Sequence, residues 1–119
     1  MSFQFINGVL FMDHVDFDTA GAQTDDLDLG ATCLPIVPTT NNDAVTGAVP
    51  QQGITGEMLW ILNASQTNKL VLKHDTGSAV GNRFLFPSDS DFTLAPNCML
   101  QFMFMDQVGR VGWWANFPA

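Results

Sequence analysis

The sequence predicts an all-β protein, built as a β-sandwich or jelly-roll-like module with an extended N-terminal arm. Short apolar runs recur along the chain, and several show the period of two that is typical of strands. Turn residues interrupt the second half roughly every 8–12 residues, a spacing typical of sandwiches and barrels. Helical periodicity is nearly absent, and 119 residues suffice for one modest core.

The first third of the chain contains two candidate strands. Between residues 9 and 17, apolar residues recur two positions apart and share one face of an extended segment. Asp13 falls on that face and marks an edge or a break. Residues 27–31 alternate in the same way, with Leu27 and Leu29 on one side.

The second half predicts six strands. The apolar run at residues 58–62 suits a central strand that is buried on both faces. Further strands are expected at residues 70–72, 84–86, 92–94, 98–105 and 110–115. Pro87 and Pro96 end two of them, because proline cannot donate to the ladder of a sheet.

Residues 39–56 have a different composition, polar and rich in glycine and proline. A connection of this length exceeds an ordinary loop, and such loops are usually functional or mobile. We therefore expect residues 1–52 to form an N-terminal arm and linker, partly extended and strand-forming. Residues 53–119 are expected to form a compact β-core.

The composition indicates a surface that is partly covered by protein. Hydrophobic residues make up 46% of the chain and charged residues only 13%, against about 25% charged residues in an ordinary soluble domain. No window reaches the roughly 18 consecutive apolar residues of a membrane span, so no membrane is expected as a partner. The start of the chain also lacks the basic segment of a secretory signal.

The net charge of −8 is unevenly distributed. Residues 1–52 contain seven of the twelve acidic residues and no lysine or arginine. Because affinity for nucleic acids rests largely on cations that neutralise phosphates, no nucleic acid is expected as a partner. The acidic half is either a solvated face that aids solubility or a segment that docks on a basic protein surface.

No residue pattern indicates catalysis. The pairs Asp13-His14 and His74-Asp75 lack the two-histidine spacing of metal sites. The acidic run at residues 25–28 lacks the closing glutamate of a calcium loop, and a solvated turn fits it better. No serine lies in a G-x-S-x-G elbow, and there is no glycine-rich phosphate loop. We therefore expect no enzyme activity, no catalytic residue, no cofactor and no bound metal.

Several short motifs follow one another in the second half. A strand ending in Asn63 precedes Leu-Val-Leu-Lys-His-Asp, which ends at Asp75. Asn82-Arg83-Phe follows, and then Asp-Phe-Thr-Leu-Ala-Pro, which begins at Asp91. In this order the motifs resemble those of small β-sandwich virion proteins of tailed bacteriophages, over about half of the chain, from residue 53 to residue 114. The order is specific, whereas each motif alone is not.

The resemblance implies a capsid decoration (cement) protein or a tail-fibre or receptor-binding module, and such modules are commonly trimeric. We expect a structural protein that binds the major capsid protein, or another virion protein, and stabilises the capsid shell. A homotrimer is expected, located in the virion and assembled in the host cytoplasm. The alternative is a tail-fibre or receptor-binding tip that binds a host-surface glycan.

Two sets of residues are candidates for a role. Arg83 is expected to pair with Asp75 or Asp91 across strands, and Asn82 to adopt the left-handed backbone of a tight turn. The whole structural set is Asn63, His74, Asp75, Asn82, Arg83 and Asp91. The interface candidates are aromatic residues near the two ends of the chain: Phe3, Phe5, Phe11, Phe17, Trp113, Trp114 and Phe117.

Overall fold

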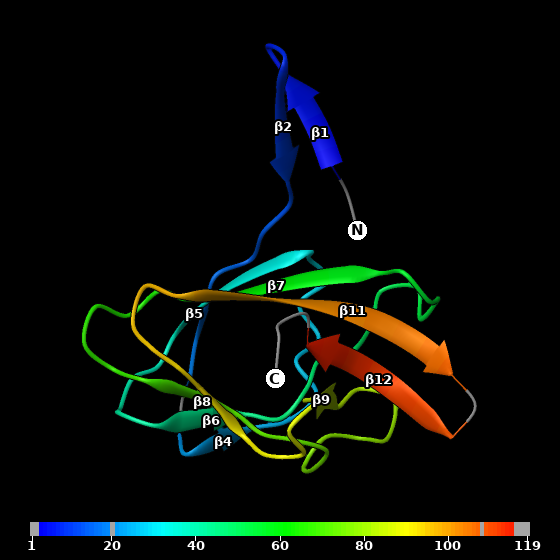
Figure 1. The fold of residues 1–119 in the computed structure, drawn as a ribbon. Helices are drawn as coiled ribbons and strands as arrows, with labels where there is room; N and C mark the ends of the chain where they lie inside the picture. Colours follow the sequence, from blue (N-terminus) through cyan, green and yellow to red (C-terminus); the bar gives the residue numbers. More distant parts are fainter. Residues whose placement is uncertain (1–2, 20, 108, 116–119) are drawn as a thin grey trace.

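The computed structural model describes residues 3–19, 21–107 and 109–115, and for residues 3–6 and 9–11 it describes the backbone alone. These residues form strands, turns and loops, with no helix among them, so the predicted all-β class is confirmed. Two mixed sheets face each other, and the larger one curls like half a barrel (Figure 1). The arrangement is consistent with the predicted β-sandwich.

Ten strands build the two sheets. The larger sheet contains β3 (Phe17–Asp18), β5 (Cys33–Val37), β7 (Met58–Asn63), β9 (Phe84–Leu85), β11 (Met99–Gln107) and β12 (Arg110–Ala115), in the order β3-β5-β7-β11-β12-β9. The smaller sheet contains β4 (Gln23–Thr24), β6 (Asp43–Val45), β8 (Leu70–Leu72) and β10 (Phe92–Leu94), in the order β10-β8-β6-β4. A separate hairpin of β1 (Phe3–Ile6) and β2 (Val9–Met12) extends away from both sheets (Figure 1).

From β3 to β8 the chain winds as a coil, because successive strands alternate between the two sheets. β3, β5 and β7 pair in parallel in the larger sheet, and β4, β6 and β8 pair in parallel in the smaller one. Cys33 pairs with Trp60, and Asp43 pairs with Leu70, so one turn of the coil spans the same length of chain in both sheets. The last strands close the coil: β10 and β11 add antiparallel to β8 and β7, and β12 adds antiparallel to β11.

The core lies between the two sheets. In β11, Leu100, Phe102 and Phe104 are buried and alternate with outward residues, as side chains do along a strand. The Phe102 ring stacks on Phe84 with 4.7 Å between ring centroids. Phe104 meets Trp113 edge-on, with 5.2 Å between the centroids. Burial of these aromatic side chains is the main source of stability in a core of this size.

The strands expected in the second half are confirmed, with shifts of one or two residues at their ends. Three other expectations are corrected. The segment at residues 9–17 is divided between β2 and β3, and residues 27–31 form no strand beyond an isolated bridge from Leu27 to Ala48. β7 is fully buried on one face and half-buried on the other, because the second face lies on the outside of the sheet.

The expected boundary at residue 52 does not separate two packing units. β5 lies between β3 and β7, and β6 lies between β4 and β8, so both halves of the chain alternate within each sheet. Ile36 and Val45 are fully buried in the common core. Residues 53–107 and 109–115 therefore share their core with residues 17–19 and 21–52, and the β1–β2 hairpin stands apart from it (Figure 1).

β6 lies inside the polar segment 39–56, where the sequence predicts a connection. Its first residue, Asp43, is 2% exposed. The Asp43 carboxylate accepts hydrogen bonds from the hydroxyls of Thr19 and Thr40, from the Thr39 hydroxyl at 3.1 Å and from the Thr40 backbone N–H at 3.2 Å. The Thr19 hydrogen bond, followed by those of Thr40, lowers the pKa of this carboxyl to about 2. The buried carboxylate thus ties the chain after β3 to the turn before β6.

Glu57 fixes the other end of the same segment. This side chain is buried, and its carboxylate accepts the backbone N–H groups of Gln51 at 2.8 Å, Gln52 at 2.8 Å and Gly53 at 3.0 Å. Three donors converge on one carboxylate, so the loop is held against the start of β7.

Candidate binding surface

The outer face of the larger sheet is apolar. Every second residue of β5, β7 and β11 points outward, and these residues meet Trp114 of β12 across the strands. We call this set the methionine face: Cys33, Pro35, Val37, Met58, Trp60, Leu62, Met99, Gln101, Met103, Met105 and Trp114. It contains four of the six methionines of the chain and no charged residue, and the same side of the sheet carries Asp18 of β3 and Arg110 of β12 at its margins.

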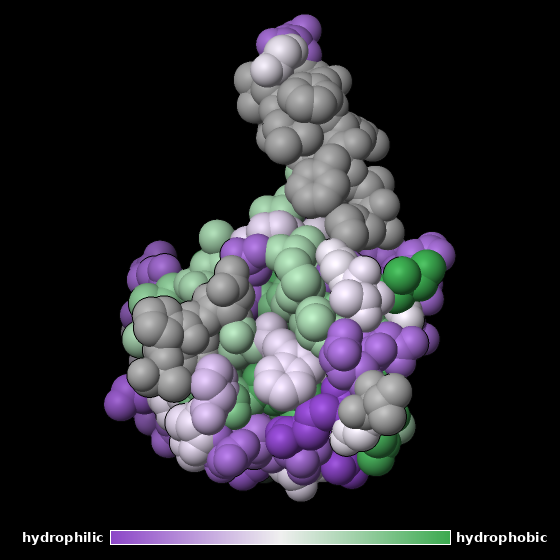
Figure 2. Space-filling view, turned by 45° about the vertical axis from the view of Figure 1, so that its right-hand side comes forward, coloured by the Kyte–Doolittle hydropathy of each residue, from purple (hydrophilic) through white to green (hydrophobic). Residues whose placement is uncertain are grey.

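Several residues of the methionine face are open to solvent. Met99 is 54% exposed and Met103 is 37% exposed. Figure 2 brings forward the right-hand side of Figure 1, where β11 connects to β12. On this side apolar residues form a band, and hydrophilic residues lie below it. Methionine is unbranched and polarisable, and it is common at binding surfaces that adapt to a partner.

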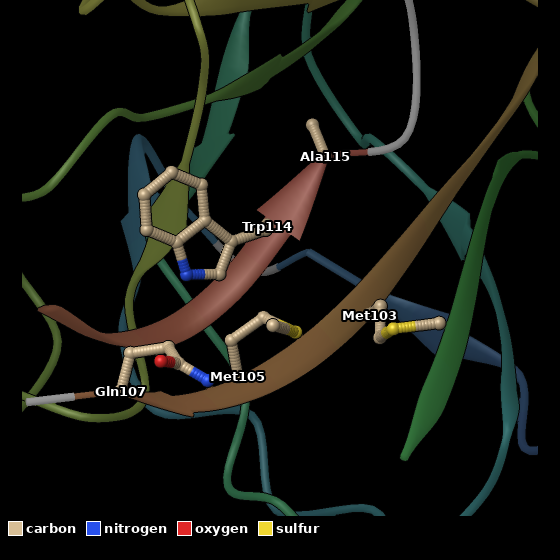
Figure 3. Close-up of a pocket in the computed structure, with 5 residues that line it drawn as sticks. All are labelled: Met103, Met105, Gln107, Trp114 and Ala115. Carbon is tan, nitrogen blue, oxygen red and sulfur yellow. The ribbon is translucent and has the colours of Figure 1, made fainter. Parts of the chain in front are cut away.

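The methionine face is hollowed between β11 and β12. The hollow has a volume of about 440 Å³ and is lined by Met103, Met105 and Gln107 of β11 and by Trp114 and Ala115 of β12. In Figure 3 the Trp114 indole extends from β12, and Met105 and Gln107 extend from the neighbouring strand β11. No charged residue lines the hollow, so it suits an uncharged, apolar occupant.

Trp114 gives the hollow one polar feature. The guanidinium carbon of Arg110 lies 5.4 Å from the centroid of the Trp114 ring, a cation–π distance. The indole Nε1 is buried and has no hydrogen-bond partner among the described residues. A buried donor without an acceptor costs about 1–3 kcal/mol. An occupant that brought a carbonyl oxygen to Nε1 would therefore be bound favourably.

The predicted pairing of Arg83 with Asp75 is present, with 3.4 Å between the guanidinium and carboxylate atoms. Arg83 Nε also donates to the Ser78 carbonyl at 2.8 Å. The Ser78 hydroxyl contacts the Thr46 hydroxyl at 2.6 Å, and Thr46 donates to the Asp25 carboxylate at 2.7 Å. We call these five residues the clasp, because they tie the loop before β9 to the chain around β4 and β6.

Asn82 extends the clasp. Its side-chain amide donates to the Asp26 carboxylate at 2.9 Å, and the Ala79 backbone N–H donates to the same oxygen at 2.8 Å. These two hydrogen bonds lower the pKa of Asp26, and the one from Asn82 has the larger effect on it. The left-handed backbone expected at Asn82 occurs instead at Gly81, whose φ is 98°. Asn82 therefore acts through its side-chain amide, and also through its backbone carbonyl, which accepts the Ala48 N–H at 2.9 Å.

The other three predicted structural residues also make internal contacts. Asn63 is fully buried, and its amide donates to two backbone carbonyls at 2.9 and 3.0 Å. Asp91 accepts the His74 backbone N–H at 2.8 Å and lies 3.1 Å from the Lys73 ammonium. His74 Nδ1 accepts the Phe86 backbone N–H at 2.9 Å. The Asn63 contacts tie β7 to the following loop and to β10, and the others tie the segments after β8 and β9 to each other and to the start of β10.

The interface candidates fall in different places. Trp113 is 1% exposed, and its indole N–H donates to the Ala48 carbonyl at 2.8 Å, so its prediction as an interface residue is corrected. Phe17 is half-buried and packs against the core, whereas Trp114 belongs to the methionine face. Phe3, Phe5 and Phe11 lie in the hairpin, of which these positions show the backbone alone, and Phe117 lies outside the described residues.

The acidic surface of residues 1–52 is smaller than its composition suggests. Four of its carboxylates serve internal contacts, those of Asp13, Asp25, Asp26 and Asp43. Asp13 accepts the Thr32 backbone N–H at 3.3 Å. The exposed acidic residues of the region are Asp16, Asp18, Asp25 and Asp28.

Residues 3–19, 21–107 and 109–115 contain no group of three His, Cys, Asp or Glu side chains that could hold a metal ion. Nor does this described part hold a helix long and apolar enough to cross a membrane. No protein-family model matches the chain, and no curated protein or solved structure is similar enough to match it. Within the described residues, the methionine face is the feature best suited to bind another molecule.

Proposed function

We propose that this chain is a structural, non-enzymatic virion protein that binds the capsid shell of a tailed phage as a decoration (cement) protein. The methionine face carries the proposal. The motif order between residues 53 and 114 supports the phage assignment. The jelly-roll-like form, the extended N-terminal arm and the homotrimer belong to the same proposal.

The methionine face is suited to a protein partner. An apolar surface transfers from water to a protein interface with a gain of about 25 cal/mol per Å². Monomeric proteins keep such patches small, and a large one marks an interaction site. With charged residues at 13% of the chain, little charge is available to keep this side of the sheet hydrated.

A tail-fibre or receptor-binding tip is the second candidate, and one observation disfavours it. A glycan-binding tip needs exposed aromatic rings, yet no phenylalanine or tryptophan is exposed among the residues whose side chains the structure describes. The exposed apolar residues are aliphatic or methionine, such as Met99. Such side chains suit a protein surface better than a sugar.

The experiment is removal of this chain from the phage particle. Particles without the chain should assemble and adsorb to cells normally but should release their DNA at a lower temperature than complete particles. Adding the purified chain should restore their heat resistance. Loss of adsorption with unchanged heat resistance would instead support the tail-fibre role. Particles that never contain the chain would reject a virion role altogether.

A further inference from the structure

We propose that the hollow in the methionine face of one copy receives the β1–β2 hairpin of a second copy, so that copies of this chain assemble head to tail. The inference does not depend on the virion role. It rests on two features of the same chain, each of which lacks a partner among the described residues.

The hairpin is preformed but needs a partner. Asn7 and Gly8 have φ values of 50° and 79°, the left-handed pair that an Asn-Gly hairpin turn requires. Seven of its ten residues, 3–12, are apolar, and none is charged. β1 and β2 pair with one another and with no other described strand. A two-stranded hairpin is marginally stable by itself in water, so an apolar one is expected to be covered.

The base of the hairpin directs it away from its own hollow. The Cys33 backbone N–H donates to the Asp13 carbonyl at 3.1 Å, and the Val15 N–H donates to the Cys33 carbonyl at 3.2 Å. These hydrogen bonds fix the chain after β2 to β5. The hollow lies between β11 and β12, on the far side of β7 from β5. The hairpin extends away from the sheets (Figure 1), which presents it to another molecule.

The hollow and the hairpin are chemically complementary. Met103 and Met105 are adaptable, and a sulfur–aromatic contact with a phenylalanine contributes about 0.3–1.5 kcal/mol. The outer edges of a two-stranded sheet carry unpaired carbonyl groups. One of these can accept the hydrogen bond that the Trp114 indole N–H lacks within the described residues.

Charged residues beside the hairpin and beside the hollow have opposite signs, which favours contact between the two. The hairpin and the hollow lining are both uncharged, but Asp16 and Asp18 are exposed just after the hairpin. Arg110 lies at the edge of the hollow over Trp114, and its ion pair with Asp75 is long, at 4.0 Å. Arg110 is therefore placed to meet the acidic stem of an incoming hairpin.

The contact joins two different surfaces of the chain, the β1–β2 hairpin of one copy and the hollow of the next, so it is head to tail. Such contacts form closed rings when the rotation between copies closes, and open filaments otherwise. A closed ring of three copies would be the homotrimer of the proposed function.

Three variants of the full chain test the proposal. Phe5→Thr with Leu10→Thr changes two residues that are opposite in register, and threonine keeps the preference for a strand while removing apolar surface. Met103→Gln with Met105→Gln makes the hollow polar at nearly constant size. Met99→Gln is the matched control, because Met99 is more exposed than Met103 and lies outside the hollow.

Sedimentation velocity at micromolar concentration is the measurement, with circular dichroism and thermal melting as checks of folding. The unchanged chain and Met99→Gln should assemble, and the two double variants should be folded monomers. An equal mixture of the double variants should form a dimer of one copy of each, because one supplies an intact hollow and the other an intact hairpin. If a double variant did not fold, the single changes Leu10→Thr and Met103→Gln would provide the same comparison.

Four results would overturn the proposal. The unchanged chain could remain a monomer, which would leave a different protein as the occupant. The double variants could assemble as the unchanged chain does, or their mixture could fail to form a dimer. Finally, Phe117→Thr could abolish assembly while the hairpin variant did not, which would make the C-terminal segment the occupant.

Discussion

Replacing Asp43 by asparagine tests how a buried carboxylate stabilises this fold. The side chain receives hydrogen bonds from Thr19, Thr39 and Thr40, and no ion pair joins it in the described part of the chain. Asparagine has nearly the same size, but it removes the charge and turns one acceptor oxygen into a donor group that faces other donors. The variant therefore isolates the contribution of the ionised form.

The magnitude follows from the pKa of Asp43, which the folded protein lowers from 3.8 to about 2. At about 1.4 kcal/mol per unit, this difference contributes about 2 kcal/mol to the free energy of unfolding at neutral pH. The unfolded chain binds the proton more readily than the folded chain does. The contribution is therefore complete above about pH 4 and is lost as the pH falls from about 4 towards 2.

Urea unfolding followed by tryptophan fluorescence measures this effect. At pH 7, Asp43→Asn should lower the free energy of unfolding by about 2 kcal/mol relative to the unchanged chain, and the difference should shrink as the pH approaches 2. Asp28→Asn is the control, because Asp28 is exposed, and it should change little. An equal loss at pH 7 and near pH 2, or no loss at pH 7, would refute the reasoning.

Three further substitutions test other internal contacts. Arg83→Ala should lower the free energy of unfolding by about 1–3 kcal/mol in urea, because the clasp loses charge-assisted hydrogen bonds, and an unchanged value would contradict a structural role. Gly47→Ala would place a Cβ atom 2.1 Å from a backbone oxygen and should cost about 3 kcal/mol, whereas Gly21→Ala, with no atom within 4 Å, should be neutral in the same thermal melts. Glu57→Gln should speed hydrogen exchange at the three backbone N–H groups that this carboxylate binds, and unchanged exchange rates there would disprove its anchoring role.

The candidate site was predictable in part. The six structural motif residues all make internal contacts and Arg83 pairs with Asp75 as predicted, but the left-handed backbone predicted at Asn82 occurs at Gly81. The hollow was not predictable, because its lining combines alternate positions of β11 with the end of β12. Methionines at positions 99, 103 and 105 were the available signal, since their even spacing of four and two residues places them on one face of a strand.

Trp113 and Trp114 show why the structure was needed to tell which of two adjacent side chains faces the core. The sequence presents both as equivalent aromatic residues. In the antiparallel pair, Trp113 is opposite Phe104 and faces the core, whereas Trp114 is opposite Met103 and faces outward. A register shift of one residue would exchange these roles, and the register is set by packing between strands.

The sequence by itself determined the all-β class and the positions of the strands from residue 58 onward. These depend on local signals, namely period-two apolar runs and the turn residues between them. Only the tertiary structure decided that β5 and β6 lie inside the sheets and that the chain coils through parallel pairs. β6 has three residues and begins with Asp43, and its strand is stabilised by a threonine 24 positions earlier in the chain. Such pairing depends on contacts between distant residues, which local propensity does not encode.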